Sequence, residues 1–130
     1  MILAIKTDNP TAELVLVDES GEVLEHETWL AERRLALELL GRLEALLKRH
    51  DASWEDLTGL IVYEGPGSFT GLRIGITVMN TIAYSQNIPI VSSSGDEWYA
   101  NGIKRLQQGE NDHIVMPAYG APARITQQRK

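Results

Sequence analysis

The amino-acid sequence predicts an α/β protein with a mixed sheet and the element order βββαβαβ. Three observations carry this prediction. Short strand-like segments lie within residues 2–29, leucines recur at helical spacing within residues 31–50, and a glycine-rich turn at residues 65–71 separates an apolar run from a second helical pattern. Strands that alternate with helices in this way favour a sheet that contains parallel pairs.

Three strands are predicted before the first helix. Residues 2–6 are apolar up to Lys6 and lead into a turn-rich segment, and residues 12–18 contain a second apolar run. A tight turn at residues 19–21 precedes residues 22–29, where apolar and polar residues alternate imperfectly. Because the connections are short, the three strands are expected to form an antiparallel meander.

The hydrophobic period then changes to that of a helix at residues 31–50. Leu35, Leu39, Leu43 and Leu47 form one stripe, and most of the charged residues lie elsewhere. One face of this helix is therefore expected to pack on the sheet. Further leucines beside the stripe suggest a second apolar surface, although a broad core-facing stripe explains them as well.

The second half of the chain is predicted to continue with alternating elements. Residues 57–63 are expected to form a strand parallel to a neighbour, because a helix precedes them. The glycine-rich turn leads to a helix at residues 72–85. Later elements are a strand that begins at residue 90, a helix at residues 97–107 capped by Ser94 or Asp96, and a last short strand at residues 113–116.

Length and composition bound the class of protein. At 130 residues the chain is expected to form one domain, residues 1–116, followed by a tail at residues 117–130 that is flexible or ordered by a partner. The net charge of −6 argues against a broad surface for direct nucleic-acid binding. There is no cysteine, and no segment approaches the roughly 18 apolar residues of a membrane span. Since no signal peptide is recognisable, the expected location is the cytoplasm.

The most specific segment is residues 65–75, which read Gly-Pro-Gly-Ser-Phe-Thr-Gly-Leu-Arg-Ile-Gly. The segment lies between a strand and a helix, and the first backbone N–H groups of a helix have no partner within it. These groups are therefore available to bind an anion or a partner's carbonyl group. It is not a Walker A sequence, and its glycine spacing has one residue too many for a dinucleotide fingerprint. Ser68 or Thr70 is expected to cap the helix. We call the following residues the signature loop: Gly65, Pro66, Gly67, Ser68, Phe69, Thr70, Gly71, Leu72 and Arg73.

This run resembles the signature of the TsaB family, the small actin-like partner proteins of bacterial tRNA threonylcarbamoyladenosine synthesis. Residues 1–7 resemble the first strand of that family, and residues 88–94 resemble the strand and turn that follow the signature helix. Residues 116–120 resemble its C-terminal Pro-x-Tyr segment. The resemblance covers roughly residues 1–100 and this short end piece.

The resemblance implies a single actin-like lobe, of the ASKHA and ribonuclease H-like class, with no catalytic residues. It implies a scaffold that binds TsaD, the threonylcarbamoyl transferase, through the first-lobe helices, with TsaE as a further partner. No cofactor or metal of its own is implied, although ATP and Mg²⁺ can be bound by the partner complex. The implied partner-binding residues are Leu35, Leu39, Leu43, Leu72, Ile76 and Met79.

Two departures from the family pattern stand out. Family members usually have a second lobe, most of which has no counterpart here. The first strand of the family usually ends in Asp-Thr-Ser, whereas this chain has Lys6-Thr7-Asp8.

Two alternative functions therefore stay open: a small nucleotide-binding actin-like ATPase that uses the signature loop and Glu64, or a self-associating module whose leucine helices form a homodimer. The three histidines lack the spacing of a metal site.

Overall fold

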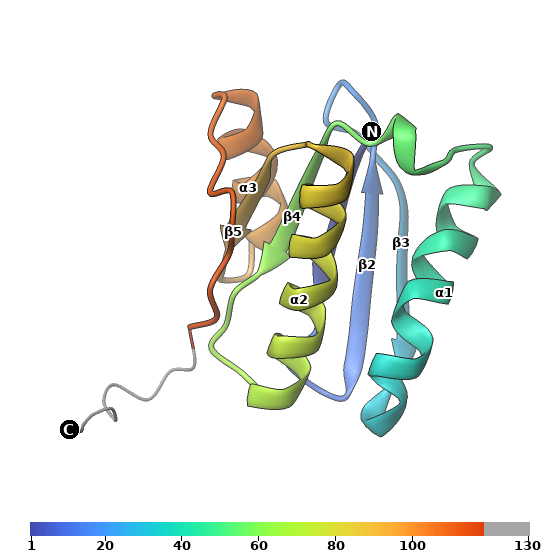
Figure 1. Ribbon diagram of the computed structural model, residues 1–130, viewed down its shortest axis with the longest axis vertical. Coiled ribbons are helices and arrows are strands. Elements are labelled where there is room, and N and C mark those ends of the chain that lie inside the picture. Colours follow the sequence, from blue (N-terminus) through green and yellow to red (C-terminus); the bar gives the residue numbers. More distant parts are fainter. Residues whose placement is uncertain (119–130) are drawn as a thin grey trace.

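The computed structural model describes residues 1–118 and contains a five-stranded mixed sheet in the order β3-β2-β1-β4-β5 (Figure 1). β1 is antiparallel to β2 and parallel to β4, β2 is antiparallel to β3, and β4 is parallel to β5. The predicted α/β class and the order βββαβαβ are confirmed. The elements are β1 Ile2–Lys6, β2 Thr11–Val17, β3 Val23–Leu30, α1 Leu35–Arg49, β4 Gly59–Tyr63, α2 Phe69–Gln86, β5 Ile90–Ser93 and α3 Trp98–Gln107, with short 3₁₀ turns at Glu32–Arg34 and Trp54–Asp56.

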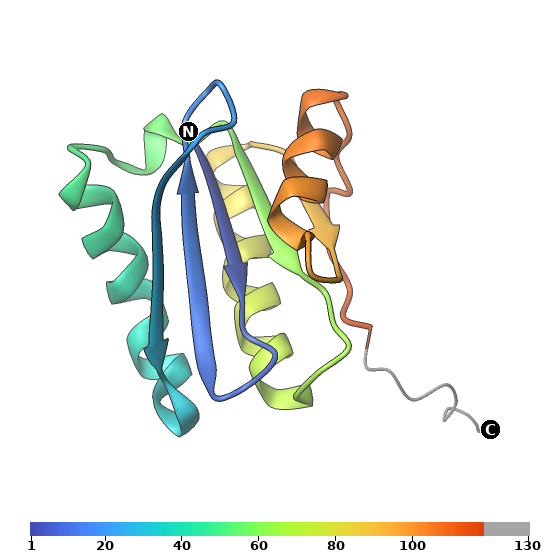
Figure 2. The same cartoon turned by 180° about the vertical axis from the view of Figure 1, so that it is seen from behind.

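The helices form two unequal layers on the sheet. α1 and α2 lie side by side over one face (Figure 1), while α3 covers the other face, where it lies in front of β4 and β5 in Figure 2. The central strands β1 and β4 are buried on both faces, which explains why they read as continuous apolar runs rather than as alternating ones. Leu3, Ile5, Leu60 and Val62 are inaccessible to solvent at the centre of this core.

The outer strand β3 meets α1 through charged side chains. Glu27 accepts hydrogen bonds from Arg42 at 2.9 Å and from Arg49 at 2.7 Å. Glu25 pairs with Arg49 at 2.8 Å and with His50 at 2.8 Å. Hydrogen bonds from Arg49 and then from His50 lower the pKa of the Glu25 carboxyl from its ordinary value. Charges that point inward at an outer strand discourage the addition of another strand there.

The segment after α3 differs from its prediction. Residues 113–116 form no strand, because His113 has a φ of 66° and cannot continue an extended ladder. The Asn80 side chain instead donates to the Val115 carbonyl at 3.1 Å and accepts from the Val115 N–H at 2.9 Å. The apolar residues of this segment resemble a strand in the sequence, but their backbone is bound by the Asn80 side chain and not by a neighbouring strand.

Element boundaries also needed correction. The predicted helix at residues 31–50 begins with a 3₁₀ turn, and its α-helical part starts at Leu35. α3 begins after Glu97 with no side-chain cap, so neither Ser94 nor Asp96 has the predicted capping role. Of the predicted tail, only Pro117 and Ala118 are described, and residues 119–130 lie outside the described part. Within residues 1–118, no helix has the length and apolar character needed to cross a bilayer.

Candidate partner-binding surface

The signature loop joins β4 to α2 and begins the helix in the predicted way. Ser68 is the residue before the helix, and its hydroxyl accepts a hydrogen bond from the Gly71 N–H at 3.5 Å, whereas Thr70 lies within the helix. The Ser68 N–H donates to the Asp8 carbonyl at 2.7 Å. The beginning of α2 is thus attached to the turn that follows β1.

Two glycines of this loop, Gly67 and Gly71, and Gly75 in the helix that follows, pack closely against that same turn. A Cβ atom at Gly67 would overlap Asp8, and Cβ atoms at Gly71 and Gly75 would overlap the Thr7 carbonyl oxygen and hydroxyl. Thr7 is 1 % exposed, and its hydroxyl donates to the Gly71 carbonyl at 2.8 Å. The spacing of the glycines therefore follows from the contact of α2 with the end of β1.

Gly65 has a different requirement. Its φ is +122°, and an added Cβ would overlap the carbonyl oxygen of Ala118. The Ala118 N–H donates to the Glu64 carbonyl at 2.7 Å. Ala118 is therefore attached beside the start of the signature loop, at Glu64, the residue that follows β4.

The other members of the signature loop differ in exposure. Pro66, Phe69, Thr70 and Arg73 are exposed, and the Arg73 guanidinium lies 5.3 Å from the centre of the Phe69 ring. Leu72 is inaccessible to solvent. Only part of the signature loop can therefore contact a partner directly.

Lys6 gives the carboxyl end of β1 a positive charge. Its ammonium nitrogen lies 2.7 Å from Asp8 Oδ1 and 3.9 Å from Glu13 Oε2, and 4.6 Å from the centre of the Tyr63 ring. The Lys6 ammonium neutralises the negative charge of these carboxylates, which would otherwise attract a divalent cation. Among the residues that the structure describes, no group of three or more His, Asp or Glu side chains could hold a metal ion. The local residues do not fit a bound Mg²⁺.

The six partner-binding residues that the family resemblance implies lie in the core of the structure and not on its surface. All six are at most 4 % exposed, because the leucine stripe of α1 and the apolar stripe of α2 both face the sheet. Such side chains hold the helices in place but cannot contact a second protein without unfolding. The six core residues are Leu35, Leu39, Leu43, Leu72, Ile76 and Met79.

The outward sides of the same two helices form a different apolar surface, which we call the outer α1/α2 face. Leu37 is 77 % exposed and Leu40 is 50 % exposed. A groove between the helices is lined by Ala36 together with Ile74 and Val78 of α2. The outer α1/α2 face consists of Ala36, Leu37, Leu40, Phe69, Ile74 and Val78.

Polar and charged residues border the outer α1/α2 face. One end of the groove continues to Asn9, Glu32 and Arg33, and Arg73 lies beside its middle. At the other end, Leu40 shares a hollow with Glu44 and other residues. An apolar centre with a polar rim is the usual composition of a protein interface.

A family model described as "TsaD: tRNA N6-adenosine threonylcarbamoyltransferase" matches residues 29–117. The TsaB protein of Bacillus subtilis, described as a tRNA threonylcarbamoyladenosine biosynthesis protein, is 38% identical over 92% of this chain and 50% of its own length. The TsaB protein of Escherichia coli is 31% identical over 81% of this chain and 47% of its own length.

A solved structure has the same fold. YeaZ from Pseudomonas aeruginosa superposes with a TM-score of 0.68 at 27% identity, covering 83% of this chain and 49% of YeaZ. The chain thus spans about half the length of the relatives that it matches. The actin-like, ribonuclease H-like fold class predicted from the sequence is confirmed.

Proposed function

Because the chain belongs to the TsaD family of actin-like proteins and, within it, to the TsaB proteins of tRNA threonylcarbamoyladenosine biosynthesis, we propose that it is a non-catalytic cytoplasmic subunit that binds the TsaD transferase. The observation that carries this proposal is the outer α1/α2 face. Leu37 and Leu40 are large apolar side chains on a helix that is already packed on the sheet by its opposite side. They are free to be buried by a second protein.

The chemistry of the partner follows from the family match. The TsaD model matches the segment of this chain that contains α1 and α2, so a TsaD protein carries a related pair of helices. Two related helix pairs can pack face to face as a four-helix seam, with each pair lying in the groove of the other. The seam would favour the competent conformation of TsaD, by no more than the difference in binding free energy between its two conformations.

The signature loop supports a scaffold better than an enzyme. Gly67 packs against Asp8 and Gly71 against Thr7, and Lys6 balances the negative charge of the nearby carboxylates. We therefore assign no catalytic residue and no cofactor to this chain. TsaE would bind the complex of this chain with TsaD and not the signature loop.

The test is co-elution of the purified chain with TsaD from the same organism, followed by calorimetry. We expect micromolar or tighter binding, weakened at least about tenfold by Leu37→Glu and by Leu40→Glu, because a charge would be buried in the seam. Ile114→Glu is the matched control, since Ile114 is 67 % exposed on the segment after α3. Leu39→Glu is unsuitable because Leu39 is inaccessible in the core.

Three results would contradict the proposal. These are no binding of the wild-type chain at micromolar concentration, equal weakening by Ile114→Glu, or saturable ATP binding by the isolated chain. The last result would favour a nucleotide-binding enzyme. A dimer of the isolated chain that Leu37→Glu dissociates would show that self-association competes for the outer α1/α2 face.

A further inference from the structure

The strand β5 lies at one edge of the sheet, so half of its backbone groups face away from β4. The carbonyls of Pro89 and Ser93 accept hydrogen bonds from the N–H groups of Leu60 in β4 and of Glu64, which follows β4. Because neighbouring residues of a strand direct their backbone groups to opposite sides, Ile90 and Ser92 direct theirs to the open edge. Such groups usually offer a template for another strand.

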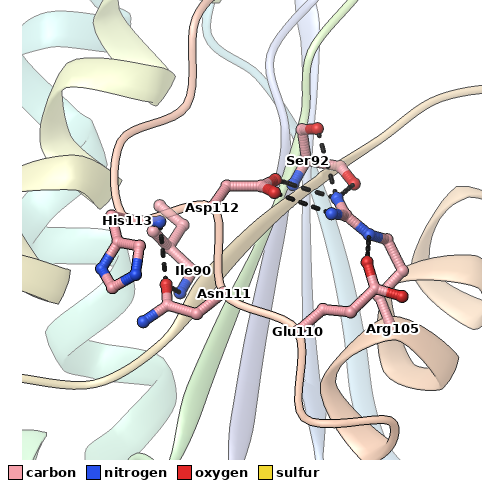
Figure 3. A network of polar contacts seen from close by, with 7 residues as sticks. All are labelled: Ile90, Ser92, Arg105, Glu110, Asn111, Asp112 and His113. Atoms are coloured by element: carbon pink, nitrogen blue, oxygen red, sulfur yellow. Dashed lines mark hydrogen bonds and ion pairs between the residues drawn. The ribbon is translucent and has the colours of Figure 1, made fainter.

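All four of these groups are bound by residues from α3 and from the loop that follows it (Figure 3). The Ile90 N–H donates to Asn111 Oδ1 at 3.1 Å, and the Ile90 carbonyl accepts from the Asp112 N–H at 2.8 Å. The Ser92 N–H donates to Asp112 Oδ2 at 2.8 Å, and the Ser92 carbonyl accepts from Arg105 Nη1 at 2.9 Å. Three of the four partners are side-chain atoms.

This arrangement differs from a sixth strand. A strand would satisfy the same groups and would present a new row of unpaired groups on its far side. Here Asn111 Oδ1 also accepts from the His113 N–H at 2.8 Å, and His113 has a positive φ, so the loop turns away from the strand direction. The ladder ends at β5.

The cluster is held together by ionic contacts. Arg105 binds Asp112 through both terminal nitrogens, at 2.8 Å and 2.7 Å, and its Nε donates to Glu110 at 2.7 Å. Glu110 contacts none of the β5 backbone groups in this cluster (Figure 3). Its bond to Arg105 can therefore be removed without opening the edge directly.

We propose that Arg105, Asn111 and Asp112 form an edge lock that prevents β5 from pairing with β5 of a second copy of this chain. β5 itself, Ile90–Ser93, carries no charge and contains no proline, and it begins with the β-branched residues Ile90 and Val91, which favour strand pairing. In a two-fold antiparallel pair centred on Val91, Ile90 of one copy would face Ser92 of the other. The same four groups that the lock binds would then make the hydrogen bonds between the two copies.

The proposal concerns the edge of the sheet and does not depend on TsaD binding. The test compares the Asn111→Ala/Asp112→Ala double variant with Glu110→Gln as the control, both carrying Leu37→Glu to suppress association through α1. We expect amide exchange at Ile90 and Ser92 to accelerate at least about tenfold in the double variant at low protein concentration, and to stay unchanged in the control.

Pairing itself is detected with a single engineered thiol, because the sequence has no cysteine. In the two-fold pair the two copies of residue 91 face each other at about 4.5 Å between Cα atoms, within the range of a disulfide. Val91→Cys should therefore give a disulfide-linked dimer on mild oxidation of the double variant and none in the locked chain. Sedimentation should show the same concentration-dependent dimer without the thiol.

The proposal is overturned if the double variant exposes both amides and yet stays monomeric, or if the locked chain forms the same disulfide. Circular dichroism shows whether the double variant folds. If it does not, Asn111→Ala alone is used, for which exchange should accelerate at Ile90 and not at Ser92. Continued protection of the Ile90 amide in that variant would also overturn the proposal.

Discussion

The guanidinium of Arg105 and the carboxylate of Asp112 are joined by two parallel hydrogen bonds, Nη1 to Oδ2 at 2.8 Å and Nη2 to Oδ1 at 2.7 Å. The pair connects α3 to the loop that covers the edge of β5. A planar guanidinium matches a carboxylate in this geometry, which a lysine ammonium could not reproduce. The contact therefore fixes the relative orientation of the two side chains as well as pairing their charges.

This pair predicts a loss of stability in acid. Hydrogen bonds from Arg105 are the main reason why the pKa of Asp112 is lowered from 3.8. A carboxyl with a depressed folded-state pKa stabilises the protein above its unfolded-state pKa, and this contribution disappears as the pH falls through the folded-state value. Asp112→Asn should cost about 1–2 kcal/mol at neutral pH, with the difference from wild type shrinking below about pH 4. Urea unfolding at a series of pH values measures both, and a difference that does not shrink at all on acidification below pH 4 would contradict the assignment.

The packing of the signature loop predicts opposite effects at two helical glycines. At Gly71 an added Cβ would overlap the Thr7 carbonyl oxygen, whereas at Gly41 nothing lies within 4 Å of it. Gly71→Ala should destabilise the protein by about 1–3 kcal/mol, because α2 must move away from β1. Gly41→Ala should stabilise it by about 0.5–1 kcal/mol through reduced backbone entropy of the unfolded chain. Equal thermal unfolding temperatures of the two variants would refute this explanation of the glycine spacing.

The double hydrogen bond of Asn80 predicts a local loosening. Asn80→Ala removes both partners of the Val115 backbone and should cost about 1–3 kcal/mol, since Val115 is only 3 % exposed. Amide exchange at Val115 should accelerate, while that of the β1 amides stays slow. Thr81→Ala is the matched control, because the Thr81 hydroxyl donates to the Thr77 carbonyl within α2. If the two variants behave alike, Asn80 does not anchor this segment.

The charge balance at the end of β1 predicts the effect of removing Lys6. Lys6→Met keeps the length of the stem but leaves Asp8 and Glu13 without their shared ammonium. With Lys6 and Asp8 side chains only 16% and 14% exposed, the cost should be about 1–3 kcal/mol. Lys48→Met, at an exposed position on α1, should be near neutral. Chemical unfolding of both variants provides the comparison, and no loss for Lys6→Met would mean that its ion pairs are solvated.

Much of this fold could be predicted because hydrophobic period and turn residues determine it locally. β1 has its predicted limits, and α2 begins after Ser68, one of its two predicted caps. The segment at residues 113–116 was missed because its backbone partner is a side chain from α2, far away in the sequence. No local pattern indicates such a partner.

The candidate surface was harder to predict for a physical reason. A stripe of leucines shows that one side of a helix is apolar, and in α1 that side is used by the protein's own core. Leu37 and Leu40 lie off the stripe and remain exposed. The sequence located the two helices, but only the packing on the sheet showed which sides are left for a partner.

The contact between the signature glycines and Thr7 has a consequence for the history of this fold. Gly71 and Gly75 preserve this contact between the first strand and the second helix, whatever chemistry takes place nearby. A related protein could lose its catalytic activity, carry Lys6 in place of the aspartate of the family pattern, and still keep these glycines unchanged. The presence of these glycines is therefore evidence for this backbone contact and not for a particular substrate.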